Sequence, residues 1–384
     1  MKEDILKNIM LNLQEKPIDQ HSKHLFINRA DILTEIGNYL SISPGIYGIC
    51  GNRGIGKTSL LKMISFQHHG FFIYIRERRS KHKILLDMLY QISSYGLKMY
   101  PDNKTFKECN TYSKYQIIET TSLSGGVDFA IQAHASTDKS KTIKETVYTV
   151  YECLEQAVDE LIKTQGSLTL FIDELDKEKK DEVEEILSSI KYILKKPNMF
   201  SIISLPMHMY VEYVRDKLSY TPFNLDNIID DMFVLKPLSD SEIKEMITTR
   251  LSPYTDIIDD DILNYITIYS EGNPREAIYI TKKILIGNKD KEHITSADAL
   301  SVIKKLVSSY EEYIDISPRE KDILSVIIKH PERSEAIKHI TQTLPMQKNT
   351  ASTYISRLKK KGYLSETNGL LRVSGKIYFL VADM

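Results

Sequence analysis

A complete phosphate-binding pattern occupies residues 51–58, which read Gly-Asn-Arg-Gly-Ile-Gly-Lys-Thr. The pattern is a glycine, any four residues, then glycine, lysine, and serine or threonine. Its glycines let successive backbone N–H groups point at phosphate oxygens, and the start of a helix adds partial positive charge there. Lys57 is suited to neutralise the β- and γ-phosphates of ATP, and the Thr58 hydroxyl is suited to bind Mg²⁺. The predicted nucleotide contacts are Gly51, Asn52, Arg53, Gly54, Ile55, Gly56, Lys57, Thr58 and Ser59.

Two adjacent carboxylates, Asp173 and Glu174, end an apolar run over residues 168–172. Neighbouring positions on a strand point to opposite sides, so one carboxylate can face a metal ion while the other faces a water molecule. Asp173 is therefore a candidate for the Mg²⁺ shell, and Glu174 for polarising the water that attacks the γ-phosphate. The pair favours a hydrolysing ATPase over a kinase or a GTPase. The alternative is a solvated strand end whose acid caps a helix.

The elements around these residues alternate between strands and helices, which predicts a parallel sheet with helices on both faces. Short apolar runs predict strands at 45–50, 71–76, 167–173, 200–205 and 232–236. Helical spacing predicts helices that start at Thr58 and that cover roughly 81–95, 142–164 and 177–195. Period-two alternation over 122–136 predicts an inserted β-hairpin with one apolar face, and we expect it to contact a neighbouring subunit or to cover its own core.

Beyond Pro237 the pattern becomes helical. We expect helices at 240–251, 258–270, 274–287 and 296–313. Three further helices and two strands follow, at 317–330, 334–343, 347–361, 363–366 and 370–373. The two strands are joined through Asn368-Gly369, which is a strong hairpin signal, so this segment predicts a winged helix.

Charge is distributed unevenly along the chain. The 384 residues carry 51 Lys and Arg against 52 Asp and Glu, which excludes a uniformly basic nucleic-acid coat. Residues 317–384 nevertheless hold 12 basic and 6 acidic residues, so the basic charge is concentrated at the C-terminal end. We expect this segment to bind duplex DNA; the alternative is a protein contact. The predicted DNA contacts are Lys348, Asn349, Ser352, Thr353, Arg357, Lys359, Lys360 and Arg372.

Several other classes of protein are disfavoured. The three cysteines are widely spaced without a CxxC pair, which argues against a disulfide scaffold or a cysteine-rich zinc site. No apolar run approaches a membrane span, and the first residues lack the apolar stretch of a signal peptide. We therefore expect a cytoplasmic protein with no membrane partner.

Four segments resemble the AAA+ ATPases of the origin-recognition type and the related STAND signalling ATPases. Residues 173–176, Asp-Glu-Leu-Asp, resemble the family's acidic signature, and residues 26–33 resemble the linker in which Arg29 borders the adenine pocket. Residues 233–243 are similar to the last strand and first lid helix, and residues 271–277 are similar to the segment called sensor 2.

The resemblance implies roles for three further residues. Arg275 reaches the γ-phosphate from the lid; the alternative is a surface arginine at a helix start. Ser204 stands near the end of the fourth strand, where the family usually has the asparagine called sensor 1, and its shorter side chain implies slow turnover. Arg215 is the candidate arginine finger acting on a neighbouring subunit, or else a solvated helix residue.

The resemblance also organises the chain. Residues 1–23 form an N-terminal extension, and residues 24–238 form a P-loop AAA+ α/β domain with the hairpin insertion near 122–136. Residues 239–314 form a helical lid, and residues 315–384 form a winged-helix domain. The expected function is an ATP-hydrolysing switch that self-associates in the ATP state and binds DNA, as an initiator, loader, transposition or defence ATPase. The alternative is a STAND-like signalling ATPase whose winged helix contacts a protein.

Overall fold

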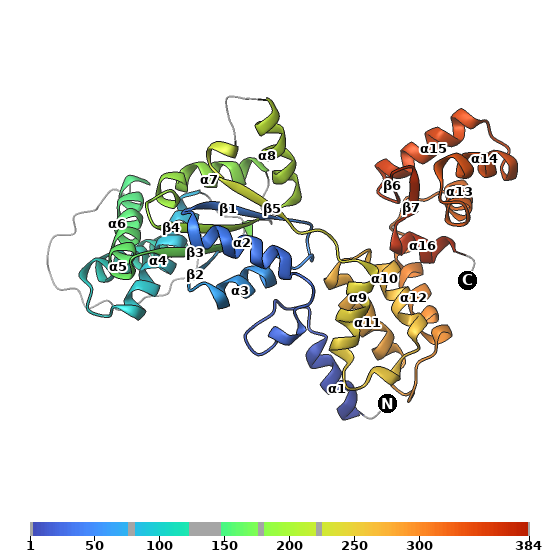
Figure 1. Cartoon of the computed structure of the whole chain (residues 1–384), viewed down its shortest axis with the longest axis horizontal. Coiled ribbons are helices and arrows are strands. Elements are labelled where there is room, and N and C mark those ends of the chain that lie inside the picture. Colours follow the sequence, from blue (N-terminus) through green and yellow to red (C-terminus); the bar gives the residue numbers. More distant parts are fainter. Residues whose placement is uncertain (1–2, 76–80, 123–146, 176–179, 220–224, 383–384) are drawn as a thin grey trace. The chain divides into compact units, whose positions relative to one another are not determined.

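The computed structural model describes residues 3–75, 81–122, 147–175, 180–219 and 225–382. It divides into two compact units. The α/β unit comprises residues 18–20 and 29–235, and the helical unit comprises residues 1–17, 21–28 and 236–384. Figure 1 gives the path of the chain through each unit.

A five-stranded parallel sheet forms the centre of the α/β unit, with the order β2-β3-β4-β1-β5. The strands are β1 (Gly45–Cys50), β2 (Phe71–Tyr74), β3 (Leu168–Asp173), β4 (Met199–Leu205) and β5 (Asp231–Val234). Every residue of β1 is buried, as expected for an apolar strand covered on both faces. Because all five strands are parallel, their carboxyl ends meet at one edge, and the loops that follow β1, β3 and β4 lie there together.

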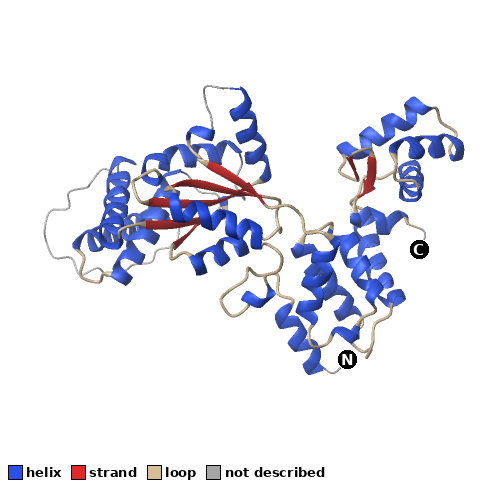
Figure 2. Cartoon of the chain, viewed as in Figure 1, coloured by secondary structure: helices blue, strands red, loops and turns tan. Residues whose placement is uncertain are grey.

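Helices cover both faces of this sheet (Figure 2). The helices of this unit are α2 (Ala30–Ile42), α3 (Lys57–Gln67), α4 (Lys81–Met99), α5 (Lys104–Ser122), α6 (Val147–Gln165), α7 (Lys180–Leu194) and α8 (Met207–Ser219), followed by the short η3 (Leu225–Asn227). Helix α5 packs against α4 and α6. The predicted parallel-sheet α/β fold is confirmed, although α2 and α5 were not among the predicted helices. The hairpin predicted at 122–136 lies outside the described residues, apart from Ser122 at the end of α5.

The helical unit begins with α1 (Glu3–Asn12), which packs against α9 (Asp240–Leu251). Ile9 and Leu13 are buried in the same apolar cluster as the later helices. Arg250 reinforces this packing, because its guanidinium donates hydrogen bonds to the carbonyls of Asn12 and Leu25. The remaining elements of this part are η1 (Lys23–Leu25), η4 (Thr255–Ile257), α10 (Asp260–Ser270), α11 (Pro274–Gly287) and α12 (Ser296–Glu311).

The C-terminal part of the helical unit has its own apolar cluster. Its elements are α13 (Pro318–Lys329), α14 (Arg333–Thr343), α15 (Lys348–Lys360), β6 (Leu364–Thr367), β7 (Leu370–Val373) and α16 (Gly375–Val381). Strands β6 and β7 pair antiparallel, and both residues of the turn between them, Asn368 and Gly369, have positive φ angles of 50° and 78°. That backbone conformation suits a tight hairpin turn and explains the Asn-Gly pair.

Helix α16, which the sequence did not predict, links two apolar clusters. Ile377 and Val381 belong to the C-terminal cluster, whereas Phe379 belongs to the cluster around α10 and α12. Gly375 lies so close to α10 that a Cβ atom there would be 2.0 Å from the Ile268 carbonyl oxygen. The C-terminal elements are therefore packed against the preceding helices through α16. Among the residues that the structure describes, no helix has the length and apolar character needed to cross a membrane.

Candidate nucleotide site

The phosphate-binding loop connects β1 to α3, and two kinds of constraint, backbone conformation and packing, require its glycines. Gly54 and Gly56 have φ angles of 85° and 105°, which strain any residue with a side chain. Gly51 is required by packing, because a Cβ atom there would lie 2.9 Å from Ile55 Cγ2 and 3.2 Å from the Leu235 carbonyl oxygen. A Cβ atom on Gly56 would meet no other atom within 4 Å, so the backbone conformation rather than packing requires glycine there.

Lys57 begins α3 and is only 5% exposed. Its ammonium donates hydrogen bonds to the carbonyls of Gly51 at 2.9 Å and of Asn52 at 3.2 Å. The positive charge therefore lies against the first residues of the loop. This places a buried cation beside the backbone that the motif uses to hold phosphate.

Two residues beside the loop hold it in place. Arg29 precedes α2, and its Nη2 lies 3.5 Å from the Ile55 carbonyl oxygen. The Ser59 hydroxyl accepts a hydrogen bond from the Ile18 backbone N–H at 3.2 Å. Arg29 therefore connects the chain before the sheet to the loop, and Ser59 connects it to the first turn of α3. The direct contact of either residue with a nucleotide stays a prediction. Asn52 and Arg53 are exposed on the loop itself.

Asp173 ends β3 and is 2% exposed. Its Oδ1 accepts hydrogen bonds from the Glu174 N–H at 2.8 Å and from the Ser204 hydroxyl at 2.6 Å. Its Oδ2 is buried and has no hydrogen-bond partner in the described part of the chain. A buried carboxylate oxygen without a partner destabilises the fold unless a ligand satisfies it. This unpaired oxygen fits Mg²⁺, which prefers hard oxygen ligands such as a carboxylate and the Thr58 hydroxyl.

Glu174 follows in the left-handed conformation, with a φ angle of 75°. Its backbone N–H contacts both Asp173 Oδ1 and the Ser204 hydroxyl, the latter at 3.1 Å. The Ser204 hydroxyl has one hydrogen, and it is directed to Asp173. Ser204 therefore holds the acidic pair in place, and the sensor 1 role that the family resemblance implied for it stays a prediction.

Tyr74 was missed by the sequence analysis although it lies beside the acidic pair. It ends β2 and is paired in register with Asp173. Burial, together with the carboxylates of Asp173 and Glu174, raises the pKa of its phenol. The only sequence signal for it was its place within the apolar run at 71–76.

The two candidate arginines lie on separate helices. Arg275 is in the first turn of α11, where the Asn273 side chain caps its backbone N–H at 3.0 Å. It belongs to the helical unit, so its contact with a nucleotide stays a prediction. Arg215 on α8 pairs with Glu212 at 3.0 Å, and its side chain is 61% exposed. Its exposure is compatible with contact to another subunit, which also stays a prediction.

The predicted DNA contacts form an exposed face on α15, with Arg372 nearby on β7. Intrachain carboxylates pair with several of the basic residues. Arg357 lies 3.5 Å from Glu320, and Lys359 lies 2.8 Å from Glu366. Arg372 also pairs with a carboxylate, at 4.0 Å from Asp240. Within the described part of the chain, Lys348 and Lys360 at the two ends of α15 form no ion pair. Asn349, Ser352 and Thr353 lie on the same helix, and the Thr353 hydroxyl donates to the Asn349 carbonyl.

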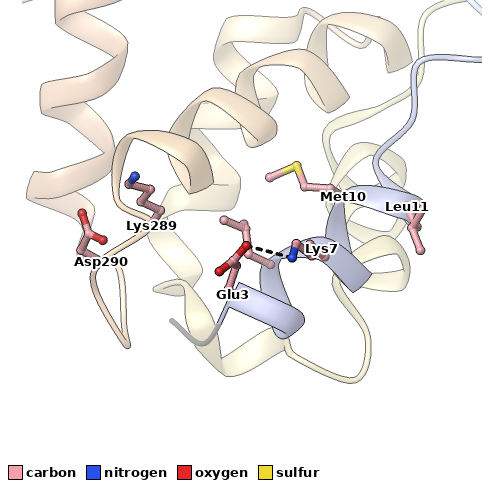
Figure 3. A pocket seen from close by; sticks show the side chains of 7 residues that line it. Glu3, Lys7, Met10, Leu11, Lys289 and Asp290 are labelled. Carbon is pink, nitrogen blue, oxygen red and sulfur yellow. Dashed lines mark ion pairs between the residues drawn. The ribbon is translucent and has the colours of Figure 1, made fainter.

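A separate hollow of about 630 Å³ lies in the helical unit, between α1 and the turn after α11 (Figure 3). Leu6 and Met10 give it an apolar floor, and Glu3 pairs with Lys7 at its rim at 2.8 Å. Its described lining residues include neither a glycine-rich loop nor a buried carboxylate. We therefore place the candidate site at the carboxyl edge of the sheet.

Comparison with known proteins identifies the family. The model of the KAP family P-loop domain matches residues 28–277. The chain belongs to this family. No curated protein sequence matches it. The membership establishes a P-loop NTPase domain that includes the loop, the acidic pair and the start of α11.

Solved structures align with most of this chain. The Walker-type ATPase PABY2304 of Pyrococcus abyssi aligns with a TM-score of 0.51 and 16% identity over 96% of this chain and 99% of that chain. The RuvB Holliday junction branch migration motor of Thermotoga maritima aligns with a TM-score of 0.44 and 18% identity over 97% of this chain and 99% of that chain. The Aeropyrum pernix ORC1 protein in complex with DNA aligns with a TM-score of 0.45 and 14% identity over 92% of each chain.

Proposed function

We propose that this KAP-family chain is a Mg²⁺-dependent ATPase of the AAA+ type that works as an ATP-controlled switch on DNA. The buried, unpaired Oδ2 of Asp173 is the observation that carries the ATPase assignment. It lies next to Glu174, at the sheet edge that also carries the complete phosphate-binding loop. An unpaired carboxylate oxygen at this position suits Mg²⁺ binding, and Glu174 beside it supplies a group that can accept a proton from water.

Each residue has a defined part in hydrolysis. Thr58 and Asp173 would hold Mg²⁺, which neutralises phosphate charge when bound. Lys57 stabilises the negative charge that builds up on the β–γ bridging oxygen. Glu174 accepts a proton from the attacking water, and Ser204 keeps Asp173 and the Glu174 backbone in fixed positions.

The direct test is release of inorganic phosphate from ATP by the full chain with Mg²⁺, with and without duplex DNA. We expect slow release that stops when Mg²⁺ is chelated. A chain that binds ATP but releases no phosphate under either condition contradicts hydrolysis and leaves only a binding domain.

The order of domains supports a switch. We propose that residues 24–238 bind ATP, residues 239–314 act as the lid, and residues 315–384 form a winged helix. Lys376 of α16 pairs with Glu276 of α11 at 2.9 Å, directly beside Arg275. A contact between Arg275 and the γ-phosphate would therefore act on α11, which this ion pair connects to α16.

DNA binding is proposed for the exposed face of α15, mainly through phosphates. Lys348 and Lys360 are the strongest candidates, because carboxylates already pair with Arg357 and Lys359. Every phosphate contact releases condensed counterions, so log K falls with log salt by about 0.9 per contact.

The double variant Lys348→Ala/Lys360→Ala is expected to bind duplex DNA more weakly and to flatten the salt slope by about 1.8. Fluorescence anisotropy of the full chain over a series of salt concentrations measures this. Lys104→Ala is the matched control, since Lys104 is an exposed lysine on α5 of the other unit. No binding of duplex DNA by the wild-type chain at low salt would contradict the DNA proposal.

A second candidate function has an observation in its favour. Glu320 and Glu366 reduce the net positive charge of the α15 face, which suits a polar protein surface as well as DNA. A STAND-like signalling ATPase that contacts a protein through these elements is therefore the alternative. If the wild-type chain does not bind duplex DNA at low salt, the signalling ATPase becomes the favoured function.

We further propose that ATP drives self-association and that Arg215 acts on the nucleotide of a neighbouring subunit. Mixing Arg215→Ala with Lys57→Ala protein is expected to restore part of the hydrolysis that each variant lacks. In mixed assemblies, the intact Arg215 of one chain then meets the intact loop of the other. Phosphate release measures hydrolysis, and mass measurement follows self-association. If the mixed chains assemble but hydrolysis does not recover, Arg215 is not the arginine finger.

A further inference from the structure

A small hollow lies between the phosphate-binding loop and the start of α8. It has a volume of about 300 Å³ and is lined by Gly51, Asn52, Arg53, Pro206, Met207 and His208. Its two walls follow neighbouring strands, because β1 and β4 pair in parallel with Cys50 opposite Leu205. The residues after β1 and after β4 therefore face each other across this space.

The wall that follows β4 offers one side chain able to bind phosphate. Pro206 and Met207 have no strong hydrogen-bonding group in their side chains, whereas the exposed His208 carries two ring nitrogens. Ser204, slightly earlier on β4, is buried, and its hydroxyl hydrogen is directed to Asp173. Of the polar groups at this end of β4, His208 is the one that lines the hollow.

The opposite wall contains the residues that hold the Lys57 ammonium. Lys57 donates to the carbonyls of Gly51 and Asn52, and both of these residues line the hollow. Because this lysine is the group that meets the β- and γ-phosphates in loops of this type, the terminal phosphate is expected at this end of the loop. A phosphate held there would lie between the loop and His208.

We propose that His208 contacts the terminal phosphate of the bound nucleotide and so distinguishes a nucleoside triphosphate from a diphosphate. The inference rests on the proposed function, because it assigns a residue to the same nucleotide site. His208 donates a hydrogen bond from a ring nitrogen to a γ-phosphate oxygen, a group that ADP lacks. The first turn of α8 adds partial positive charge on the same side.

The position of His208 also connects the nucleotide to an exposed surface. His208, Val211, Arg215 and Leu218 are spaced three or four residues apart on α8, so they lie on one face of the helix. Val211 is 49% and Leu218 79% exposed, so this face of the helix is open to solvent. Binding of a triphosphate at His208 would therefore position the helix that carries this face.

The test compares affinities for ATP and ADP in full-length protein that also carries Glu174→Gln, so that ATP persists during the measurement. His208→Ala is expected to weaken ATP binding about tenfold while ADP binding changes less than about twofold. His208→Gln, which retains a side-chain donor, is expected to recover part of the ATP affinity. The matched control is His69→Ala, an exposed histidine beyond the far end of α3.

The outcomes separate the two proposals. Equal loss of ATP and ADP affinity, or no loss, in His208→Ala overturns the role of His208. Unchanged ADP affinity shows that the variant is folded. Absence of ATP binding or of phosphate release in the wild-type chain instead overturns the proposed function, whatever His208 does.

Discussion

Lys57→Ala is expected to abolish tight ATP binding. The lysine is buried at the start of α3, and its ammonium lies against the loop that cradles the phosphates. Removing a buried charge that pairs with an anion costs about 2–5 kcal/mol, or roughly thirtyfold to several-thousandfold in affinity. Titration of the full chain with a fluorescent ATP analogue and Mg²⁺ measures the loss.

A control separates charge loss from misfolding. Lys62→Ala removes a lysine from the same helix, beyond the loop, and is expected to bind ATP with unchanged affinity. Thermal unfolding of both variants shows whether the fold survives. If Lys57→Ala binds ATP as well as the wild type while folded, the loop does not hold the phosphates.

The sheet was predictable because its strands are short apolar runs bounded by turn residues. Gly45–Cys50 illustrates this, since an apolar segment buried on both faces is followed directly by a glycine-rich loop. The loop itself was predictable because the φ angles of Gly54 and Gly56 leave little choice of residue. Local sequence patterns are sufficient to predict these elements because the strand and the loop are each determined by neighbouring residues.

The position of α1 was not predictable in this way. Its apolar residues repeat at helical spacing, but nothing local says that Ile9 and Leu13 pack against α9, more than two hundred residues away. The same holds for α16, whose seven residues acquire their role from contacts with two separate clusters. Tertiary packing, rather than intrinsic propensity, stabilises these elements.

Side-chain partners were the least predictable part of the candidate site. The motif indicates Asp173 and Glu174, but only the placement of β4 next to β3 brings the Ser204 hydroxyl between them. On α15, the sequence shows a row of cations, whereas the fold brings Glu320 and Glu366 to two of them. Function at both places depends on hydrogen bonds and ion pairs between residues far apart in the chain.

Glu174→Gln is expected to keep ATP bound and to slow hydrolysis by about two to four orders of magnitude. The substitution preserves the size of the side chain and removes its ability to accept a proton from water. It also leaves the local backbone intact, because the contacts to Asp173 and Ser204 use the Glu174 N–H rather than its carboxylate. The left-handed conformation of residue 174 should therefore survive the change.

Phosphate release and nucleotide affinity, measured on the same preparation, test this expectation. Glu35→Gln on the exposed side of α2 is the matched control and should hydrolyse ATP at the wild-type rate. The ATP-bound Glu174→Gln protein should also remain in its self-associated form, since the nucleotide that drives assembly is no longer converted to ADP. Hydrolysis by Glu174→Gln at the wild-type rate would mean that another group activates the water. The unpaired oxygen of Asp173 would then be the only part of the acidic pair with a role at the nucleotide.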